Sequence, residues 1–370
     1  MVFFYLSGLS KTMNNVKKAL LFLFLLLNLA AVFFILLSYF SVWIPPDKWW
    51  IPSLFGLAYP FFLSANLLFV VFWLIFKPRY LLISLVAVML GWGFLSRYFQ
   101  VGGKKSGSGE IKVVSYNVQH FSGNNGSGQK QSADEIIKFL EGEKADIICL
   151  QEVRLRKNSI FNLEQTVRAI STINHYQYAR SSTTYGSVTM TRYPIVHMGE
   201  IRFKNSRNMT IYTDVMIQND TVRIYNVHLQ SYHIDPNRYS VIDSPDITEE
   251  KDLREMREIS IKFKKAIQMR AEQSRIVREH IEKSPYAVIL CGDFNDTPAS
   301  FSYHRTRGNL KDAFVESGRG IGRTYVGKLP SFRIDYIFHS SDFESFRFQT
   351  LDFRLSDHLP VTCELVKKKN

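Results

Sequence analysis

The stretch AVILCGDFND, residues 287–296, joins a continuous apolar run to an abrupt series of polar residues. The run Ala287–Cys291 predicts a strand that is buried on both faces of a sheet. Asp293 and Asn295 follow it at once. The stretch ADIICLQEV, residues 145–153, has the same pattern and brings Glu152 to the end of its strand. Because loops at strand ends on a rigid sheet often carry functional groups, these polar residues are the first candidates for a site.

The rest of the chain after residue 110 alternates between further strand patterns and helical patterns. Residues 132–141 have a helical pattern, and residues 247–283 are charged and apolar at helical spacing, which predicts one or two amphipathic helices. This order of mixed strands and helices predicts an α/β fold built as a layered sandwich. The further strand candidates are residues 111–118, 187–190, 211–217, 222–229, 335–338 and 359–365.

Polar residues recur at or just past the ends of these strands. Carboxylate and amide oxygens are hard ligands that suit Mg²⁺ or Mn²⁺, and no group of His and Cys has zinc spacing. A histidine held by a buried aspartate can stay cationic near neutral pH and stabilise charge that develops on a phosphoryl group. The pattern therefore indicates metal-assisted phosphoryl chemistry. The set comprises Asn117, Glu152, Asn226, His228, Asp293, Asn295, Asp335, Asp357 and His358.

The first third of the chain has a different composition. Residues 19–100 contain a single acid, Asp47, and three apolar stretches lie within them: Ala19–Val42, Ile51–Phe76 and Leu81–Ser96. The first two are long enough to cross a bilayer, which takes about 20 residues. A signal peptide does not explain the first stretch, which is too long and lacks a small-residue cleavage site. We expect a membrane region at residues 1–100 with about three transmembrane helices, a flexible linker at 101–109 and a catalytic domain at 110–370.

Basic residues near these stretches predict the orientation in the membrane. Lys11, Lys17 and Lys18 precede the first stretch, and Lys77 and Arg79 lie between the second and third. Because Lys and Arg are enriched in the cytoplasmic segments of membrane proteins, these positions favour a cytoplasmic N-terminus. With three spans the catalytic domain is extracytoplasmic, whereas two spans would place it in the cytoplasm.

Charge and cysteine content leave some alternatives open. The formal net charge of +13 is explained either by phosphate-bearing partners, such as nucleic acid or anionic lipid headgroups, or by cations scattered over a solvated surface. The three cysteines, Cys149, Cys291 and Cys363, lie in or beside apolar runs. Their odd number and their spacing argue against disulfides and a zinc site, so they are interpreted as small buried residues.

Six short motifs occur in an order that resembles the endonuclease/exonuclease/phosphatase superfamily. This superfamily includes pancreatic-type deoxyribonuclease, neutral sphingomyelinases and inositol polyphosphate phosphatases. The resemblance spans residues 111–366 and implies a four-layer α/β sandwich, in which two packed mixed sheets are flanked by helices. The motifs are SYNV at 115–118, LQEV at 150–153, NVHL at 226–229, GDFND at 292–296, RIDYIF at 333–338 and SDHLPV at 356–361.

The resemblance also implies roles for individual residues. Glu152 resembles the principal metal ligand, with Asn117 and Asp357 in the same metal region. Asp293 resembles the acid that prepares the attacking water, and Asn295 resembles a phosphate-orienting amide. Asp335 and His358 resemble the pair on the scissile phosphate, with His228 as the second histidine. Deoxyribonucleases support that second histidine with a glutamate, but residues 171–186 contain no acid, so what orients His228 is left open.

Three functions fit this sequence. The first is a membrane-anchored phosphodiesterase or phosphatase that uses Mg²⁺, with Mn²⁺ as the alternative, on lipid headgroups or small phosphoesters. The second is a Mg²⁺-dependent nuclease that cleaves DNA or RNA. The third is a binding module without activity, against which the intact set of acids and histidines argues. The expected partners are the phosphoester substrate and the bilayer, and no protein partner is inferred.

Overall fold

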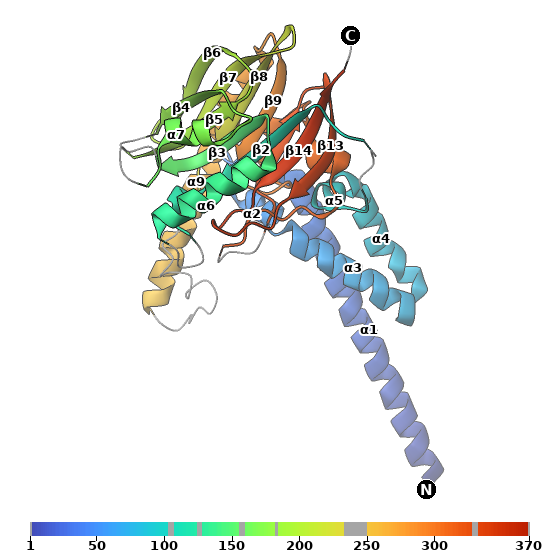
Figure 1. Cartoon of the computed structure of the whole chain (residues 1–370). Helices are drawn as coiled ribbons and strands as arrows, with labels where there is room; N and C mark the ends of the chain where they lie inside the picture. Colours follow the sequence, from blue (N-terminus) through green and yellow to red (C-terminus); the bar gives the residue numbers. More distant parts are fainter. Residues whose placement is uncertain are drawn as a thin grey trace.

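The computed structural model describes residues 2–102, 107–123, 128–154, 160–181, 184–232, 250–327 and 332–368, with side chains from residue 15 onward. Part of the expected linker, residues 103–106, lies outside these ranges. The described chain forms a helical N-terminal region and an α/β domain, which meet near the end of the first helix (Figure 1).

The first sheet of the α/β domain is mixed. Its central strands β2 and β3 run parallel, and all its other neighbours are antiparallel. The two edge strands, β4 and β13, were not among the strands expected from the sequence. In order across the sheet its strands are β13 (Phe343–Thr350), β14 (Val361–Lys367), β2 (Ile111–Asn117), β3 (Ile147–Arg154), β5 (Tyr185–Thr191) and β4 (His175–Arg180).

The second sheet repeats this plan. Its one parallel pair is β8 with β9, at the centre of the sheet. Edge strands β6 and β10 were likewise not expected from the sequence. In order its strands are β10 (Lys311–Asp312), β12 (Asp335–His339), β9 (Ala287–Asp293), β8 (Asp220–His228), β7 (Met209–Ile217) and β6 (Ile195–Arg202).

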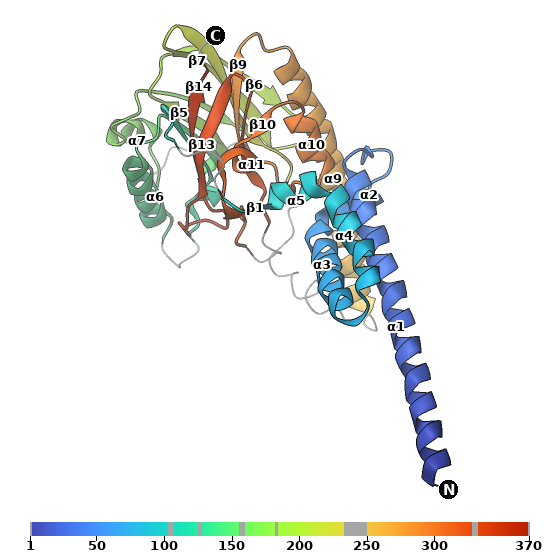
Figure 2. The ribbon, with the colours of Figure 1, turned by 90° about the vertical axis from the view of Figure 1, so that its right-hand side faces the viewer.

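Packing of the two sheets produces the expected four layers. A core of aliphatic side chains from both sheets fills the space between them, and it includes all three cysteines, which are buried and free. Helices α6 (Gln129–Glu143) and α7 (Leu163–Ala169) cover the first sheet. Helices α9 (Glu250–Glu282) and α10 (Phe301–Arg307) cover the second sheet, on the opposite side of the molecule (Figure 2). The short helix α11 (Ala313–Ser317) follows β10 and packs beside β13.

Two helices of the N-terminal region are long and apolar enough to cross a membrane, and a bent pair forms a third candidate. The two are α1 (Val2–Ser41), over Asn15–Ser41, and α3 (Tyr59–Phe76). The expected stretch 51–76 is divided, because α2 (Ile51–Leu57) ends before Pro60, which lies in the first turn of α3. A single 3₁₀ turn at Pro78–Tyr80 then leads into the bent pair.

The third candidate consists of α4 (Leu81–Leu90) and α5 (Trp92–Tyr98), with a bend of 70° between them. A chain of buried side-chain hydrogen bonds joins α4 to α1 and α3. Asn28 donates to Ser84 Oγ at 2.5 Å, Ser84 donates to Asn66 Oδ1 at 2.9 Å, and Trp73 donates to Asn28 Oδ1 at 2.8 Å. Such polar contacts hold apolar helices together where the hydrophobic effect between them is weak.

The N-terminal helices dock directly on the α/β domain at the loop that precedes α10. Ala299 packs within the apolar cluster of α1, α3 and α4. Its carbonyl accepts a hydrogen bond from Ser41 Oγ, and the Pro298 carbonyl accepts one from Arg97. Strand β1 (Phe99–Gln100) pairs with β11 (Gly320–Ile321) close by. The α/β domain is therefore held in a defined orientation at the end of the helices.

This docking predicts a strict requirement for glycine at position 56. A Cβ atom added there would lie 2.3 Å from the Ala299 carbonyl oxygen, whereas one at Gly93 would meet nothing within 4 Å. We expect Gly56→Val to destabilise the full-length protein by about 1–3 kcal/mol, as overpacking typically does. The measurement is thermal unfolding in detergent, with Gly93→Val as the control for valine in a helix. Equal melting temperatures for the two variants would contradict the docking.

Candidate active site

Strand register brings the predicted site residues to one edge of the paired sheets. In the parallel pair β2–β3, Asn117 lies opposite Gln151, one residue before Glu152. In the second sheet Asp293, at the end of β9, lies opposite both His228 on β8 and Asp335 on β12. Residues that are far apart in the chain therefore become neighbours in space.

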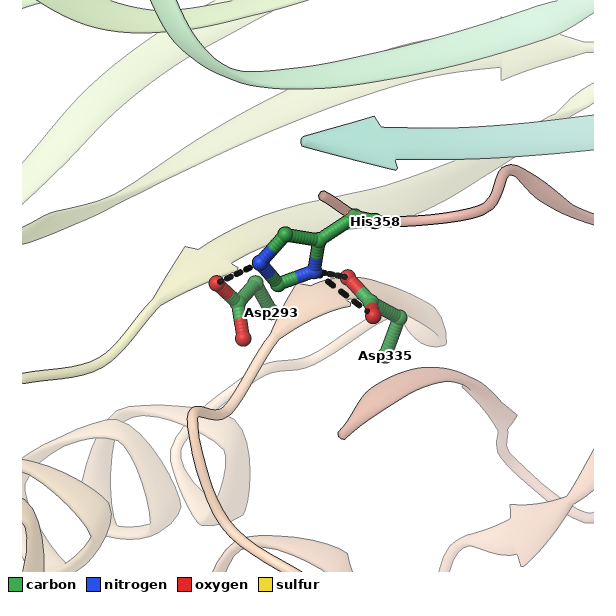
Figure 3. A group of neighbouring side chains, drawn as sticks. All are labelled: Asp293, Asp335 and His358. Carbon is green, nitrogen blue, oxygen red and sulfur yellow. Dashed lines mark hydrogen bonds and ion pairs between the residues drawn. The ribbon is translucent and has the colours of Figure 1, made fainter. Parts of the chain in front are cut away.

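A buried histidine–aspartate pair forms the centre of this edge (Figure 3). His358 Nδ1 lies 3.0 Å and 3.2 Å from the two carboxylate oxygens of Asp335, and its Nε2 lies 3.7 Å from Asp293 Oδ2. Burial alone would lower the pKa of His358, but the negative charges of Asp335 and Asp293 outweigh burial and raise this pKa well above its ordinary value. His358 is therefore an imidazolium at neutral pH, aimed at Asp293.

The loop that carries His358 is tied to the first sheet by a serine. Ser356 Oγ accepts a hydrogen bond from the His358 backbone N–H at 3.2 Å and donates to the Asn117 carbonyl at 2.7 Å. Between them, Asp357 keeps a partly exposed carboxylate, with its Oδ1 4.0 Å from His358 Nε2. Asp357 thus lies at the rim of the site.

Asp293 accepts three hydrogen bonds from amide groups. Its Oδ2 receives Asn117 Nδ2 at 3.0 Å and Asn295 Nδ2 at 2.9 Å, and its Oδ1 receives the Asn295 backbone N–H at 2.7 Å. Burial raises the pKa of this carboxyl, while the His358 charge opposes the rise. His228 Nε2 lies 3.8 Å from Asp293 Oδ2 and 3.5 Å from Glu152 Oε1, so both histidines face the same acid.

A β-bulge directs Glu152 into the site. Regular pairing of β3 with β5 stops at Leu150–Val188 and resumes at Val153–Gly186, so β3 contains one extra residue. Glu152 takes a left-handed φ of 54° there. Burial, together with the charges of Asp293 and Asp357, raises the pKa of Glu152 to about 7, and the charge of His358 opposes this rise. The Glu152 carboxyl is thus largely removed from solvent and lies close to two other acids.

A buried asparagine from the second sheet spans the gap beside this bulge. Asn226 Nδ2 donates to the carbonyls of Leu150 at 3.1 Å and Val188 at 2.9 Å, which is the last regular pair before the bulge. Its Oδ1 accepts from Gln151 Nε2 at 2.8 Å. Asn226 therefore joins the two sheets and does not face the reacting groups.

Gly292 lets the two central strands of the second sheet come close together. Its φ is 141°, and a Cβ atom there would lie 1.9 Å from the Val227 carbonyl oxygen. Only glycine fits this position, since other residues are strained at this φ and would collide with the neighbouring backbone. The close approach places His228 beside Asp293.

His120 was not among the predicted site residues, but it contacts the candidate metal ligand. Its Nε2 lies 3.1 Å from Glu152 Oε2, its Nδ1 lies 3.1 Å from the Glu152 carbonyl, and its ring packs on Tyr185. The sequence signal for it was its position, three residues after Asn117. Because the contact depends on a left-handed φ of 58° at His120, strand patterns alone do not reveal it.

One group of ligand atoms is close enough to surround a cation: single atoms of Asp293, Asp335 and His358 lie within 4.8 Å of one another. However, Nδ1 of His358 is engaged by Asp335, and the negative charges of Asp335 and Asp293 favour the protonated ring, so His358 is a poorer candidate for a metal ligand than a carboxylate. Glu152 and Asp357 add two partly exposed carboxylates at this edge, beside the amide of Asn117.

Comparison with known proteins agrees with this geometry. A model of the endonuclease/exonuclease/phosphatase family matches residues 114–358, and a model described as a domain of unknown function matches residues 20–98. No curated protein matches the sequence.

Similar solved structures share the fold. An endonuclease/exonuclease/phosphatase from Beutenbergia cavernae has a TM-score of 0.51 at 16% identity, covering 69% of this chain and 71% of that one. A mannosyl-6-phosphatase from Bacteroides thetaiotaomicron has a TM-score of 0.51 at 19% identity, covering 70% and 100%. The human Nocturnin catalytic domain with bound sulfate has a TM-score of 0.50 at 15% identity, covering 70% and 94%.

Together the fold, the family match and the edge of acids, amides and paired histidine define a phosphoester hydrolase. The chain belongs to the endonuclease/exonuclease/phosphatase family. Its α/β domain is therefore a catalytic domain, and it carries in addition a helical region with candidate membrane spans.

The cross-sheet amide gives a testable prediction. Asn226→Leu preserves the approximate volume but removes the donor to two buried carbonyls, and a lost buried hydrogen bond costs about 1–3 kcal/mol per group. We expect the melting temperature to fall by about 5–10 °C and the Mg²⁺ concentration needed for activity to rise, because the bulge holding Glu152 loosens. Asn174→Leu, at an exposed position, is the control. Unchanged melting and metal dependence in Asn226→Leu would contradict the role given to this amide.

Proposed function

We propose that the protein is a membrane-anchored, divalent-metal-dependent phosphodiesterase or phosphatase that acts on lipid headgroups or small phosphoesters. The observation that carries this proposal is the position of the docking loop. Pro298 and Ala299, which contact the membrane helices, follow Asn295 by three and four residues. The candidate site is thus held at a short, defined distance from the membrane region, which favours substrates at the bilayer surface.

The donors at the site fit a hard cation. Glu152, Asp357 and Asn117 are assigned as the residues that would hold Mg²⁺, or Mn²⁺ as the alternative, because oxygen donors suit these ions. The closeness of Asp293 and Asp357 to Glu152 supports this assignment, because a bound cation would offset the repulsion among these acids. When bound, the cation would neutralise the phosphate and stabilise the charge of the transition state.

The remaining residues supply a general base and the groups that orient the phosphate and stabilise its charge. Asp293, whose pKa is raised by burial, is assigned to orient the attacking water and accept its proton. Asn295 holds Asp293 through two hydrogen bonds and is assigned, from the family resemblance, to orient the phosphate. His358, kept cationic by Asp335, would stabilise negative charge on the phosphoryl oxygens together with His228.

Loss of the imidazolium tests these assignments. We expect His358→Ala to lower hydrolysis of bis(p-nitrophenyl) phosphate by about a thousandfold, because one preorganised charge-stabilising group contributes on that scale. EDTA should abolish wild-type activity, and Mg²⁺ or Mn²⁺ should restore it. His197→Ala, on the exposed edge strand β6, serves as the matched control.

Two results would contradict the proposal: wild-type rates in His358→Ala, or activity that survives the chelator. The same preparation is tested on phosphatidylinositol 4-phosphate and sphingomyelin in vesicles and on plasmid DNA. The net charge of +13 favours a nuclease as the second candidate, and cleavage of DNA alone, weakening steeply with salt, would establish it instead.

We also infer that the helices cross the membrane three times and place the catalytic domain outside the cytoplasm. Lys17 lines one groove with Phe72 and Phe76, so it lies at the same end of the bundle as Lys77 and Arg79, remote from the catalytic domain. The distance from there to Ser41 is about 35 Å of helix, enough to cross a bilayer. Helix α4 returns toward the catalytic domain, which supports an odd number of crossings.

Labelling of introduced cysteines tests this orientation. Because all three native cysteines are buried, a membrane-impermeant maleimide should report only new thiols. In right-side-out vesicles we expect Val101→Cys, which is 85% exposed, to be labelled and Lys77→Cys to be protected. Both variants should be labelled in detergent. The opposite pattern would place the catalytic domain in the cytoplasm, and labelling of both in intact vesicles would contradict three crossings.

A further inference from the structure

A cavity of about 330 Å³ lies beside the candidate active site and is lined by three cations. Arg207 comes from the loop between β6 and β7, and Lys262 and Lys265 come from α9. Among the described residues, none that lines the cavity is acidic, and none of the three cations has a carboxylate partner. We call this cavity the basic pocket. Uncompensated cations in a concave surface attract an anion.

One short loop separates the basic pocket from the candidate catalytic residues. The Leu229 carbonyl accepts hydrogen bonds from Asn295 Nδ2 at 3.1 Å and from Asn208 Nδ2 at 2.9 Å. The next residue, Gln230, lines the pocket, and its Oε1 accepts from Ser206 Oγ at 2.7 Å. A ligand bound in the basic pocket would therefore lie next to a phosphoester bound at His228 and Asn295.

The wall between the two sites is rigid. Gln230 donates its backbone N–H to Gln273 Oε1 at 2.8 Å, and its carbonyl accepts from Arg270 Nη1 at 2.8 Å. Arg270 is fully buried and also pairs with Asp296 at 3.1 Å. Because these contacts order the loop before any ligand binds, the pocket is preformed, which lowers the entropic cost of binding.

The helix that supplies both lysines also touches the membrane region. Gln268 donates to the Pro46 carbonyl at 3.4 Å, and Arg275 pairs with Asp47, both in the connection that follows α1. Lys265 precedes Gln268 by three residues, which is about 4.5 Å along a helix axis. Figures 1 and 2 show the first turns of α9 on the side from which α1 leaves the catalytic domain. The basic pocket thus lies on the membrane-facing side.

We propose that the basic pocket binds a second anionic group, a phosphate, of a substrate carried by the membrane, while the scissile phosphoester occupies the candidate active site. This inference rests on the proposed function. The guanidinium of Arg207 and two ammonium groups match the charge of a phosphomonoester. A phosphate-bearing lipid headgroup has the required combination of membrane attachment and two phosphates.

The lining favours a headgroup over nucleic acid. Proteins that bind single strands combine cations with aromatic side chains on which bases stack. Among the described residues that line the basic pocket, none is aromatic. The pocket therefore offers a compact anion site without a surface for bases.

Binding without turnover tests the pocket separately from catalysis. The full-length protein in phosphatidylcholine nanodiscs is titrated, in EDTA, against fluorescein-labelled inositol 1,4-bisphosphate, and fluorescence polarisation reports binding. The pocket variant is Arg207→Ala/Lys262→Ala/Lys265→Ala. The control is Lys130→Ala/Lys138→Ala/Arg168→Ala, which removes the same charge from exposed positions on α6 and α7. We expect affinity to fall about tenfold or more in the pocket variant and less than about twofold in the control, because only the former loses charge-assisted hydrogen bonds.

A second arm identifies the source of the phosphate. Nanodiscs that contain about 10% phosphatidylinositol 4-phosphate, an anionic lipid, should weaken binding of the soluble probe severalfold in the wild type and in the control variant. Equal affinity of pocket and control variants, with both melting as the wild type does, would overturn the pocket. Absence of competition from the lipid would overturn the membrane source. Pocket-dependent binding of a labelled oligothymidylate in place of the inositol probe would assign the cations to nucleic acid. Each of these results can occur whether or not the enzyme hydrolyses phosphodiesters.

Discussion

The catalytic edge depends on the union of the two sheets through the side chain of Asn226. An extra residue in β3 turns Glu152 toward the second sheet, and this interrupts the regular pairing of β3 with β5. Asn226 donates to the carbonyls of the last regular pair, and Gln151 donates back to it. Buried backbone carbonyls need partners, so the bulge and the asparagine stabilise each other. This contact adds to the aliphatic core between the sheets and fixes the bulge of the first sheet against β8 of the second.

Electrostatics at the edge follow from placing several acids where water is largely excluded. Burial raises the pKa values of Asp293 and Glu152, while Asp335 and Asp293 raise that of His358. The imidazolium compensates part of the negative charge, and the amides of Asn117 and Asn295 solvate Asp293. Glu152 lies close to Asp293 and Asp357, and a divalent cation bound there would offset the repulsion among these acids.

Much of this arrangement could be predicted from the sequence, because central strands in both sheets are continuous apolar runs that end in polar residues. The residues 287–291 and 145–150 showed the strands, and Asp293 and Glu152 marked their ends. The edge strands β4, β6, β10 and β13 could not be predicted in this way, since edges are partly exposed or very short and lack apolar runs. The contact made by His120 depends on a left-handed backbone conformation, and the role of Asn226 depends on contacts between the two sheets. Neither feature produces a periodic pattern in the sequence.

The contact between the N-terminal helices and the catalytic domain could not be predicted from composition either. Composition distinguishes two dissimilar units, but it carries no information about how they pack. The contact has a consequence for mechanism. Strand β9 ends at Asp293, and Asn295 follows it. The chain then passes through Asp296, which pairs with Arg270, and reaches Ala299, which packs against the N-terminal helices. The segment that positions the candidate base Asp293 is thus the same segment that the N-terminal helices contact. A tether alone would only raise the local concentration of substrate, whereas a rigid contact at this loop also restricts the orientations in which a phosphoester can reach Asp293. Selection among substrates at the bilayer would then arise from geometry that the isolated catalytic domain lacks.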